Sequence, residues 1–165
     1  MMKKWLITIA VSFLTIFAAS GYWLYNDVTG SVPQVEGAKQ LVYDETTVTS
    51  ITERERYHGE KAFDVFYGYD DNGEEQIVWV KESEDEDKDT QIVQRREADG
   101  WSKAEVQEHV ESELAVQELK DIRLGMIQTT PVYEVIYIDD QGRFSYYYLR
   151  FSDGQYIRQY HIRNT

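Results

Sequence analysis

The segment FDVFYGYDDNG, Phe63–Gly73, recurs later in the chain as YEVIYIDDQG, Tyr133–Gly142. Each copy is a run of β-branched and aromatic residues that ends in an Asp-rich turn with glycine. Such runs form strands, and the glycine supplies the positive φ that a tight hairpin needs. The turns are 69 residues apart, but the strands before them match at an offset of 70. One residue is therefore extra in the first copy, and we predict a β-bulge near Gly68.

The residues around the second copy predict a helix followed by an antiparallel meander. Ser102 and Glu105 have the spacing of a capping box, which predicts a helix from Lys103 to about Leu114. Val106, Val110 and Leu114 recur at every fourth position and form one apolar stripe. Four strand-like runs follow, at residues 116–128, 132–138, 143–151 and 155–162.

The first copy has the same order of elements. A helix is predicted over residues 35–44, and strands over 47–57, 61–69, 74–81 and 91–96. The acidic segment 82–89 is predicted to be a solvated loop, because runs of like charge stay in water. We therefore predict an α+β protein with two tandem units, residues 35–97 and 100–165.

The N-terminal segment has the features of a membrane anchor. Trp5–Tyr25 contains no charged residue, and its 21 residues are long enough to cross a bilayer as a helix. Lys3 and Lys4 precede it, so the positive-inside rule places the bulk of the chain outside the cytoplasmic membrane. The prediction is a cytoplasmic tip at 1–4, a single-pass helix at 5–25 and a linker at 26–34. The alternative is a secreted protein whose signal peptide is cleaved near Ser20.

Charge and composition exclude several classes of function. The chain has 30 acidic and 17 basic residues, a net charge of −13. Such a surface repels nucleic acid phosphates, so nucleic-acid binding is not expected. The chain has no cysteine, which rules out disulfides and thiolate metal sites.

A search for catalytic and metal-binding motifs finds none. The sequence has no G-x-S-x-G, no H-E-x-x-H and no Gly-rich phosphate loop. The Asp-rich turns fail the EF-hand pattern, because the position five residues before the glycine is Gly68 in one copy and Tyr137 in the other. The three histidines, His58, His109 and His161, lie far apart in the sequence. We expect no enzyme activity, no cofactor and no metal.

Pairing the second-copy strands by their turns predicts two different sheet faces. Tyr133, Val135 and Tyr137 share one face with Tyr147, Leu149 and Phe151, and this apolar face should cover the helix stripe. The opposite face mixes aromatic and charged residues, which is typical of a contact surface. Its candidate partner-binding residues are Glu134, Ile136, Phe144, Tyr146, Tyr148, Arg150 and His161, with Ile138 and Gln159 beside them. The alternative is that this face packs against the first copy, or is an ordinary solvated sheet face.

From Tyr57 to the C-terminus the chain resembles the YpmB-like proteins of Gram-positive bacteria, the cell wall elongation regulator TseB-like family. The resemblance includes the N-terminal anchor and rests on Val65–Val80, the Gly100-Trp101-Ser102 helix start, the Tyr133–Gly142 hairpin and Asp153-Gly154. The second copy also resembles a PepSY module. The resemblance implies two cystatin-like units, each a helix wrapped by a curved antiparallel sheet.

The same resemblance implies a function in cell wall synthesis. The expected role is a non-enzymatic, membrane-anchored regulator or adaptor that binds a membrane-bound wall-synthesis enzyme such as a penicillin-binding protein. A PepSY-type peptidase-inhibitory or propeptide-like binding module is the alternative. An enzyme that acts on wall glycan through paired carboxylates is the third class, although no carboxylate pair stands out among so many acidic residues.

Overall fold

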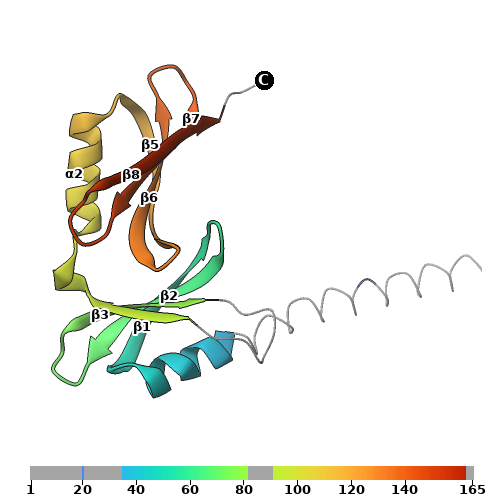
Figure 1. Ribbon diagram of the computed structural model, residues 1–165, viewed down its shortest axis with the longest axis vertical. Helices are drawn as coiled ribbons and strands as arrows, with labels where there is room; N and C mark the ends of the chain where they lie inside the picture. Colours follow the sequence, from blue (N-terminus) through green and yellow to red (C-terminus); the bar gives the residue numbers. More distant parts are fainter. Residues whose placement is uncertain (1–19, 21–34, 82–90, 163–165) are drawn as a thin grey trace, which may run out of the picture. The chain divides into compact units, whose positions relative to one another are not determined.

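The computed structural model describes residues 20, 35–81 and 91–162 (Figure 1). The chain divides after Gln40 into two compact units, and both β-sheets belong to the second, residues 41–165. Apart from Ser20, the predicted tip, anchor and linker lie outside the described residues, as does the acidic segment 82–89. No helix in the described part of the chain is long and apolar enough to cross a membrane.

The first sheet is an antiparallel meander of four strands in the order β1-β2-β3-β4. Helical residues 35–45 precede it. Its strands are β1 (Val48–His58), β2 (Ala62–Asp70), β3 (Glu75–Lys81) and β4 (Ile92–Arg96). The predicted helix and the four predicted strands of the first copy are confirmed to within a residue or two at each end.

The second sheet repeats this arrangement in the order β5-β6-β7-β8. A 3-10 turn, η1 (Glu97–Asp99), leads into α2 (Lys103–Glu113). The strands are β5 (Val116–Ile127), β6 (Thr130–Asp139), β7 (Phe144–Arg150) and β8 (Tyr156–Ile162). The α+β class and the duplicated order of helix and meander are therefore confirmed.

The capping box and the turn glycines have the roles that the sequence predicts. The Ser102 side chain accepts a hydrogen bond from the Glu105 backbone N–H, and the Glu105 carboxylate accepts one from the Ser102 N–H. This capping box starts α2 at Lys103. Three turn glycines have positive φ, namely Gly73 (76°), Gly142 (73°) and Gly154 (64°). Each lies in a hairpin turn, where residues with a Cβ would be strained.

The predicted bulge is in a different strand from the one expected. β2 pairs with β3 without a register shift, and the shifts lie in β1, between Val48 and Ser50 and between Ile51 and Glu53. β5 has the same two shifts. The prediction of an extra residue in the first-copy hairpin strand is thus wrong. Bulged β1 instead approaches Gly68 so closely that a Cβ there would overlap the Ser50 carbonyl oxygen.

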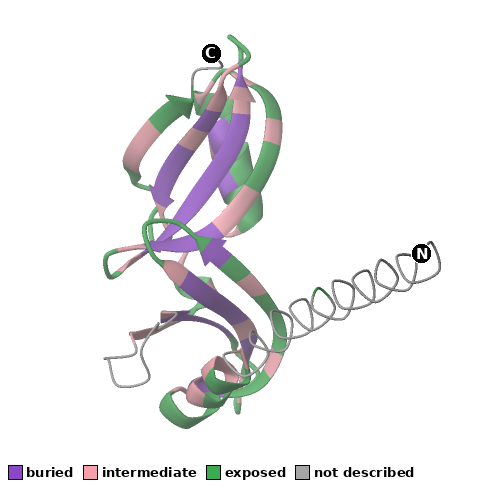
Figure 2. Ribbon diagram, turned by 90° about the vertical axis from the view of Figure 1, so that its right-hand side faces the viewer, coloured by how far each residue is buried: buried purple, intermediate pink, exposed green. Residues whose placement is uncertain are grey.

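One hydrophobic core joins the two sheets. On the second sheet, Tyr133, Val135, Tyr137, Tyr147, Leu149 and Phe151 pack with Val106 and Val110 of α2, as predicted. On the first sheet, Phe63, Val65, Ile77 and Trp79 belong to the same cluster. The Trp79 ring meets Phe151 edge-on, with 5.8 Å between ring centroids. Figure 2 shows the buried stretches that run along the central strands.

Candidate functional site

The face of the second sheet that points away from the α2 core is the candidate contact surface, and we call it the outer face. Strand pairing places β6, β7 and β8 residues on it in register, with Ile136 opposite Tyr146 and Tyr146 opposite Tyr160. The outer-face residues of these three strands include Val132, Glu134, Ile136, Ile138, Phe144, Tyr146, Tyr148, Arg150, Arg158, Tyr160 and Ile162. Six of the seven predicted site residues therefore share this face.

His161 and Gln159 lie on the other face of the sheet, contrary to the prediction. Leu149 pairs with Tyr156 and Tyr148 pairs with Arg158, so Ile157 is an extra, bulged residue. A shift of one residue moves every following side chain to the opposite face. The Gln159 amide donates to the Tyr137 hydroxyl (2.5 Å), and His161 Nδ1 lies 2.7 Å from Ser145 Oγ. The same shift brings Arg158, Tyr160 and Ile162 onto the outer face.

Aromatic rings form a continuous ladder along the outer face. Ring centroids are separated by 5.7 Å between Phe144 and Tyr146, 5.4 Å between Tyr146 and Tyr160, and 5.5 Å between Tyr160 and Tyr148. The Arg158 guanidinium lies 4.7 Å from the Tyr148 ring centroid. Such contacts fix the rings in place, which lowers the conformational entropy that the surface loses on binding.

One end of the ladder is buried where the two sheets meet. Tyr148 is 2% exposed and Glu134 is 4% exposed, and the Tyr148 hydroxyl donates a hydrogen bond to the Glu134 carboxylate. Burial, followed by this hydrogen bond, raises the pKa of Tyr148 above its ordinary value. Tyr57 of β1 is also buried, and burial, followed by the nearby Glu134 charge, raises its pKa. The alternative of packing against the first copy is correct for this end of the outer face.

The other end of the ladder is open to solvent. Phe144 and Tyr146 are half-buried, whereas Tyr160 is 42% and Ile162 50% exposed. A hollow of about 310 Å³ lies beside them. Its lining combines cationic, acidic and apolar side chains: His58, Lys120, Asp121, Arg123, Glu134, Ile136, Phe144 and Tyr146. Arg150, the remaining predicted site residue, lies at the end of β7 and forms an ion pair with Asp153 (2.9 Å).

A Ser–His–Asp group in the structure does not have the geometry of a catalytic triad. Ser145 Oγ lies 2.7 Å and Asp139 Oδ2 lies 3.5 Å from the same imidazole atom, His161 Nδ1. A triad needs the nucleophile and the carboxylate on different ring nitrogens. Ser145 is also fully buried. These groups hold the end of β8 against β7.

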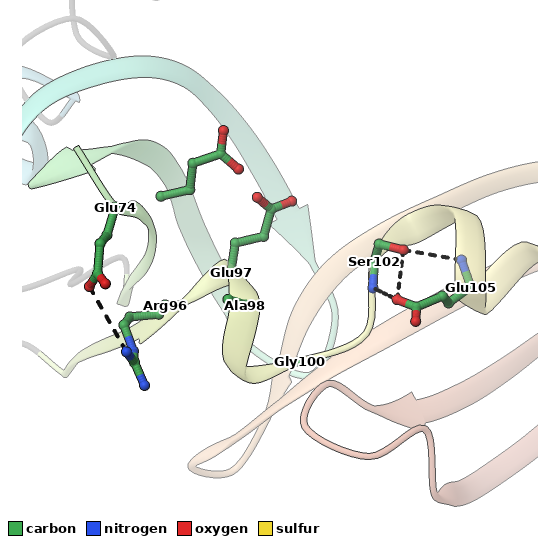
Figure 3. A pocket seen from close by; sticks show the side chains of 8 residues that line it. Glu74, Arg96, Glu97, Ala98, Gly100, Ser102 and Glu105 are labelled. Carbon is green, nitrogen blue, oxygen red and sulfur yellow. Dashed lines mark hydrogen bonds and ion pairs between the residues drawn. The ribbon is translucent and has the colours of Figure 1, made fainter.

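A second hollow, of about 480 Å³, lies where η1 leads into α2 (Figure 3). Its lining is mainly acidic, with Glu74, Glu75, Glu97 and Glu105 beside Arg96. A hydrogen bond that the protonated Glu97 carboxyl donates to the Glu75 carboxylate, together with burial, raises the pKa of Glu97 to about 6. Arg96 pairs with Asp99 (2.8 Å). No cluster of potential metal ligands occurs among the described residues.

Known proteins are similar to this chain in sequence and in fold. The family model of the cell wall elongation regulator TseB-like domain matches residues 37–81. A protein named "Probable cell wall elongation regulator TseB", from Bacillus subtilis (strain 168), is 24% identical over 161 residues, which cover 96% of this chain and 98% of that protein.

A solved structure has the same fold. The YpmB protein from Bacillus subtilis superposes with a TM-score of 0.71 at 24% identity, covering 77% of this chain and 96% of the solved chain. The family-model match covers the segment from the first helix to β3, and the full-length relative extends the similarity through the second sheet. Residues 37–81 thus match the cell wall elongation regulator TseB-like domain, and over its full length the chain is similar to a protein named for that role.

Proposed function

We propose that this protein is a membrane-anchored, extracytoplasmic regulator of cell wall synthesis that acts by binding another protein and not by catalysis. The observation that carries the proposal is the open end of the outer face, where ordered aromatic rings adjoin a hollow with cationic and acidic walls. Mixed aromatic and charged surfaces of this kind are typical of protein interfaces. The similarity to a protein named as a probable cell wall elongation regulator supports a role in cell wall synthesis.

The proposed partner is a membrane-bound wall-synthesis enzyme such as a penicillin-binding protein. Residues 5–25 have the composition of a single membrane-spanning helix, with Lys3 and Lys4 on the cytoplasmic side. A tether of this kind confines the folded part close to the bilayer and raises its effective concentration toward other membrane proteins. The two helix-plus-meander units, which we take to be cystatin-like, then act as a rigid support for the contact surface.

The test is recovery of partners from membranes with the tagged full-length protein, crosslinked in cells and solubilised. We expect a wall-synthesis enzyme to be recovered by the parent protein and at least about tenfold less by Tyr146→Ala, because aromatic anchors dominate interface energies. Tyr69→Ala is the matched control, since Tyr69 is an exposed tyrosine on the first sheet. Recovery of no wall-synthesis enzyme, or equal loss with both variants, would contradict the proposal.

A further inference from the structure

Three of the four edge strands have features that discourage pairing with another chain. β1 and β5 each have two register shifts and carry charges of both signs, and β4 is only five residues long. Bulges, charges and short length are the usual means by which proteins block strand addition at sheet edges. The remaining edge strand, β8, has one bulge, at Ile157, but residues 158–162 after it pair with β7 without a shift. It also differs from the other edges in side-chain exposure and in charge.

The exposed side chains of β8 are apolar or cationic. Tyr156 (54% exposed), Tyr160 and Ile162 are three of the five exposed large hydrophobic residues in the described part of the chain. Arg158 and His161 are the strand's ionisable groups other than tyrosine, and β8 has no carboxylate. β8 therefore carries no negative charge, although the protein as a whole has a net charge of −13.

Arg158 is held in place without an anionic partner. Its guanidinium lies against the Tyr148 ring and 5.7 Å from the Tyr160 ring centroid. Its Nε is buried and has no hydrogen-bond acceptor, and no ion pair joins Arg158 to another described residue. A carboxylate brought alongside β8 would therefore be the first anionic partner of this guanidinium among the described residues.

The backbone of β8 is available for pairing at alternate residues. The Arg150 N–H donates to the Gln155 carbonyl, which starts the β7–β8 ladder. The Asp139 N–H donates to the Arg143 carbonyl, which starts the β6–β7 ladder. Antiparallel ladders alternate, so Phe144 and Tyr146 direct their backbone groups toward β8 and pair with Ile162 and Tyr160. Gln159 and His161 consequently direct their backbone N–H and C=O groups outward.

We propose that β8 accepts an extended segment of a partner protein as an added antiparallel strand. The segment places a carboxylate opposite Arg158 and apolar side chains opposite Tyr160 and Ile162. This proposal rests on the proposed binding function and specifies how the partner is held. A second copy of this chain fits less well, because it brings another Arg158 to the contact and joins two strongly acidic molecules.

The probe is the capped peptide Val-Thr-Val-Thr-Glu-Thr, which in antiparallel register sets its two valines over Ile162 and Tyr160 and its glutamate over Arg158. Its titration into the purified full-length protein is followed by backbone amide NMR. The comparison peptide has lysine in place of glutamate. Gln159→Pro removes the outward N–H at the centre of β8, and Gln159→Ala is the control, because both variants lose the side-chain bond to Tyr137.

We expect saturable shifts of the Gln159, Tyr160 and His161 amides at millimolar glutamate peptide, and about tenfold weaker binding of the lysine peptide. Gln159→Pro should abolish the shifts while Gln159→Ala retains them. Absence of the shifts, equal binding of both peptides or equal binding by both variants would overturn the proposal. Concentration-dependent shifts of these amides without peptide would show that a second copy occupies β8, and would overturn it too. If strand addition fails while Tyr146-dependent recovery of a wall-synthesis enzyme persists, the proposed function stands without it.

Discussion

Tyr148 of β7 donates its hydroxyl hydrogen to Glu134, the residue directly opposite it on β6, and both side chains are buried where the two sheets meet. The Tyr160 hydroxyl lies 2.6 Å from the Tyr148 hydroxyl, which extends the network from the buried junction to the open aromatic ladder. The outer face thus has a structural end and an accessible end.

Removing the Tyr148 hydroxyl should destabilise the protein. Tyr148→Phe leaves the buried Glu134 carboxylate without its donor, which costs about 1–3 kcal/mol of unfolding free energy. The measurement is urea denaturation of parent and variant. Tyr69→Phe is the control, because Tyr69 donates to Glu75 (3.0 Å) at the surface, where water can replace the lost donor, so its effect on stability should be much smaller. Equal losses of unfolding free energy in the two variants would show that the buried contact with Glu134 stabilises the protein no more than the surface contact with Glu75.

The close approach of β1 to β5 makes Gly125 sensitive to substitution. A Cβ at Gly125 would overlap the ring of Tyr57, which is itself buried. Gly125→Ala should therefore cost about 1–3 kcal/mol through overpacking. Gly37→Ala is the matched control, because nothing lies within 4 Å of its added methyl group and alanine favours the helix by roughly 0.5–1 kcal/mol. The melting temperature should fall for Gly125→Ala and rise for Gly37→Ala. Tolerance of Gly125→Ala would contradict the tight packing of Tyr57 on β5.

The Glu75–Glu97 pair should make stability depend on pH. The pKa of Glu97 is raised to about 6 in the folded protein, so its stabilising effect is complete below its ordinary value of 4.5 and is lost as the pH rises through 6. The pKa of Glu75 is lowered, so its effect is lost in the opposite direction, as the pH falls. We expect the free energy of unfolding to decline by no more than about 1 kcal/mol between pH 5 and 7, since the site is partly solvated.

The variant Glu97→Gln isolates this effect. Glutamine can still hydrogen-bond to Glu75 but does not ionise, so the decline in melting temperature between pH 5 and 7 should become smaller. The three histidines remain in both proteins and therefore cancel in the comparison. A parent and a variant with identical pH profiles in that range would show that the two carboxyl groups are not coupled.

Local signals in the sequence were sufficient to predict the helices and strands and to predict which residues of β6 and β7 share a face. The capping box at Ser102, the glycines of the turns and the alternation in β6 and β7 depend on neighbouring residues alone. The β8 register was not predictable in this way, because the bulge at Ile157 has no glycine or other marker. That single residue explains the misplacement of His161 and the omission of Arg158 and Tyr160.

Long-range packing was also not readable from the sequence. Phe63, Asp64, Val65 and Phe66 are consecutive in β2 and all buried, since that strand is covered on both faces. A run of this kind indicates burial but does not say what covers each face. The contact of Trp79 with Phe151, and the position of Tyr148 at the junction, depend on how the two sheets pack.

The central claim, that the open end of the outer face binds a wall-synthesis enzyme at the membrane, is tested most directly by site-specific photocrosslinking in living cells. A benzophenone side chain at Tyr160, on the outer face, is compared with the same probe at Tyr69 on the first sheet. The account predicts a crosslink from position 160 to a membrane-bound wall-synthesis enzyme and none from position 69. Absence of that crosslink at position 160, or the same adduct from both positions, would contradict it.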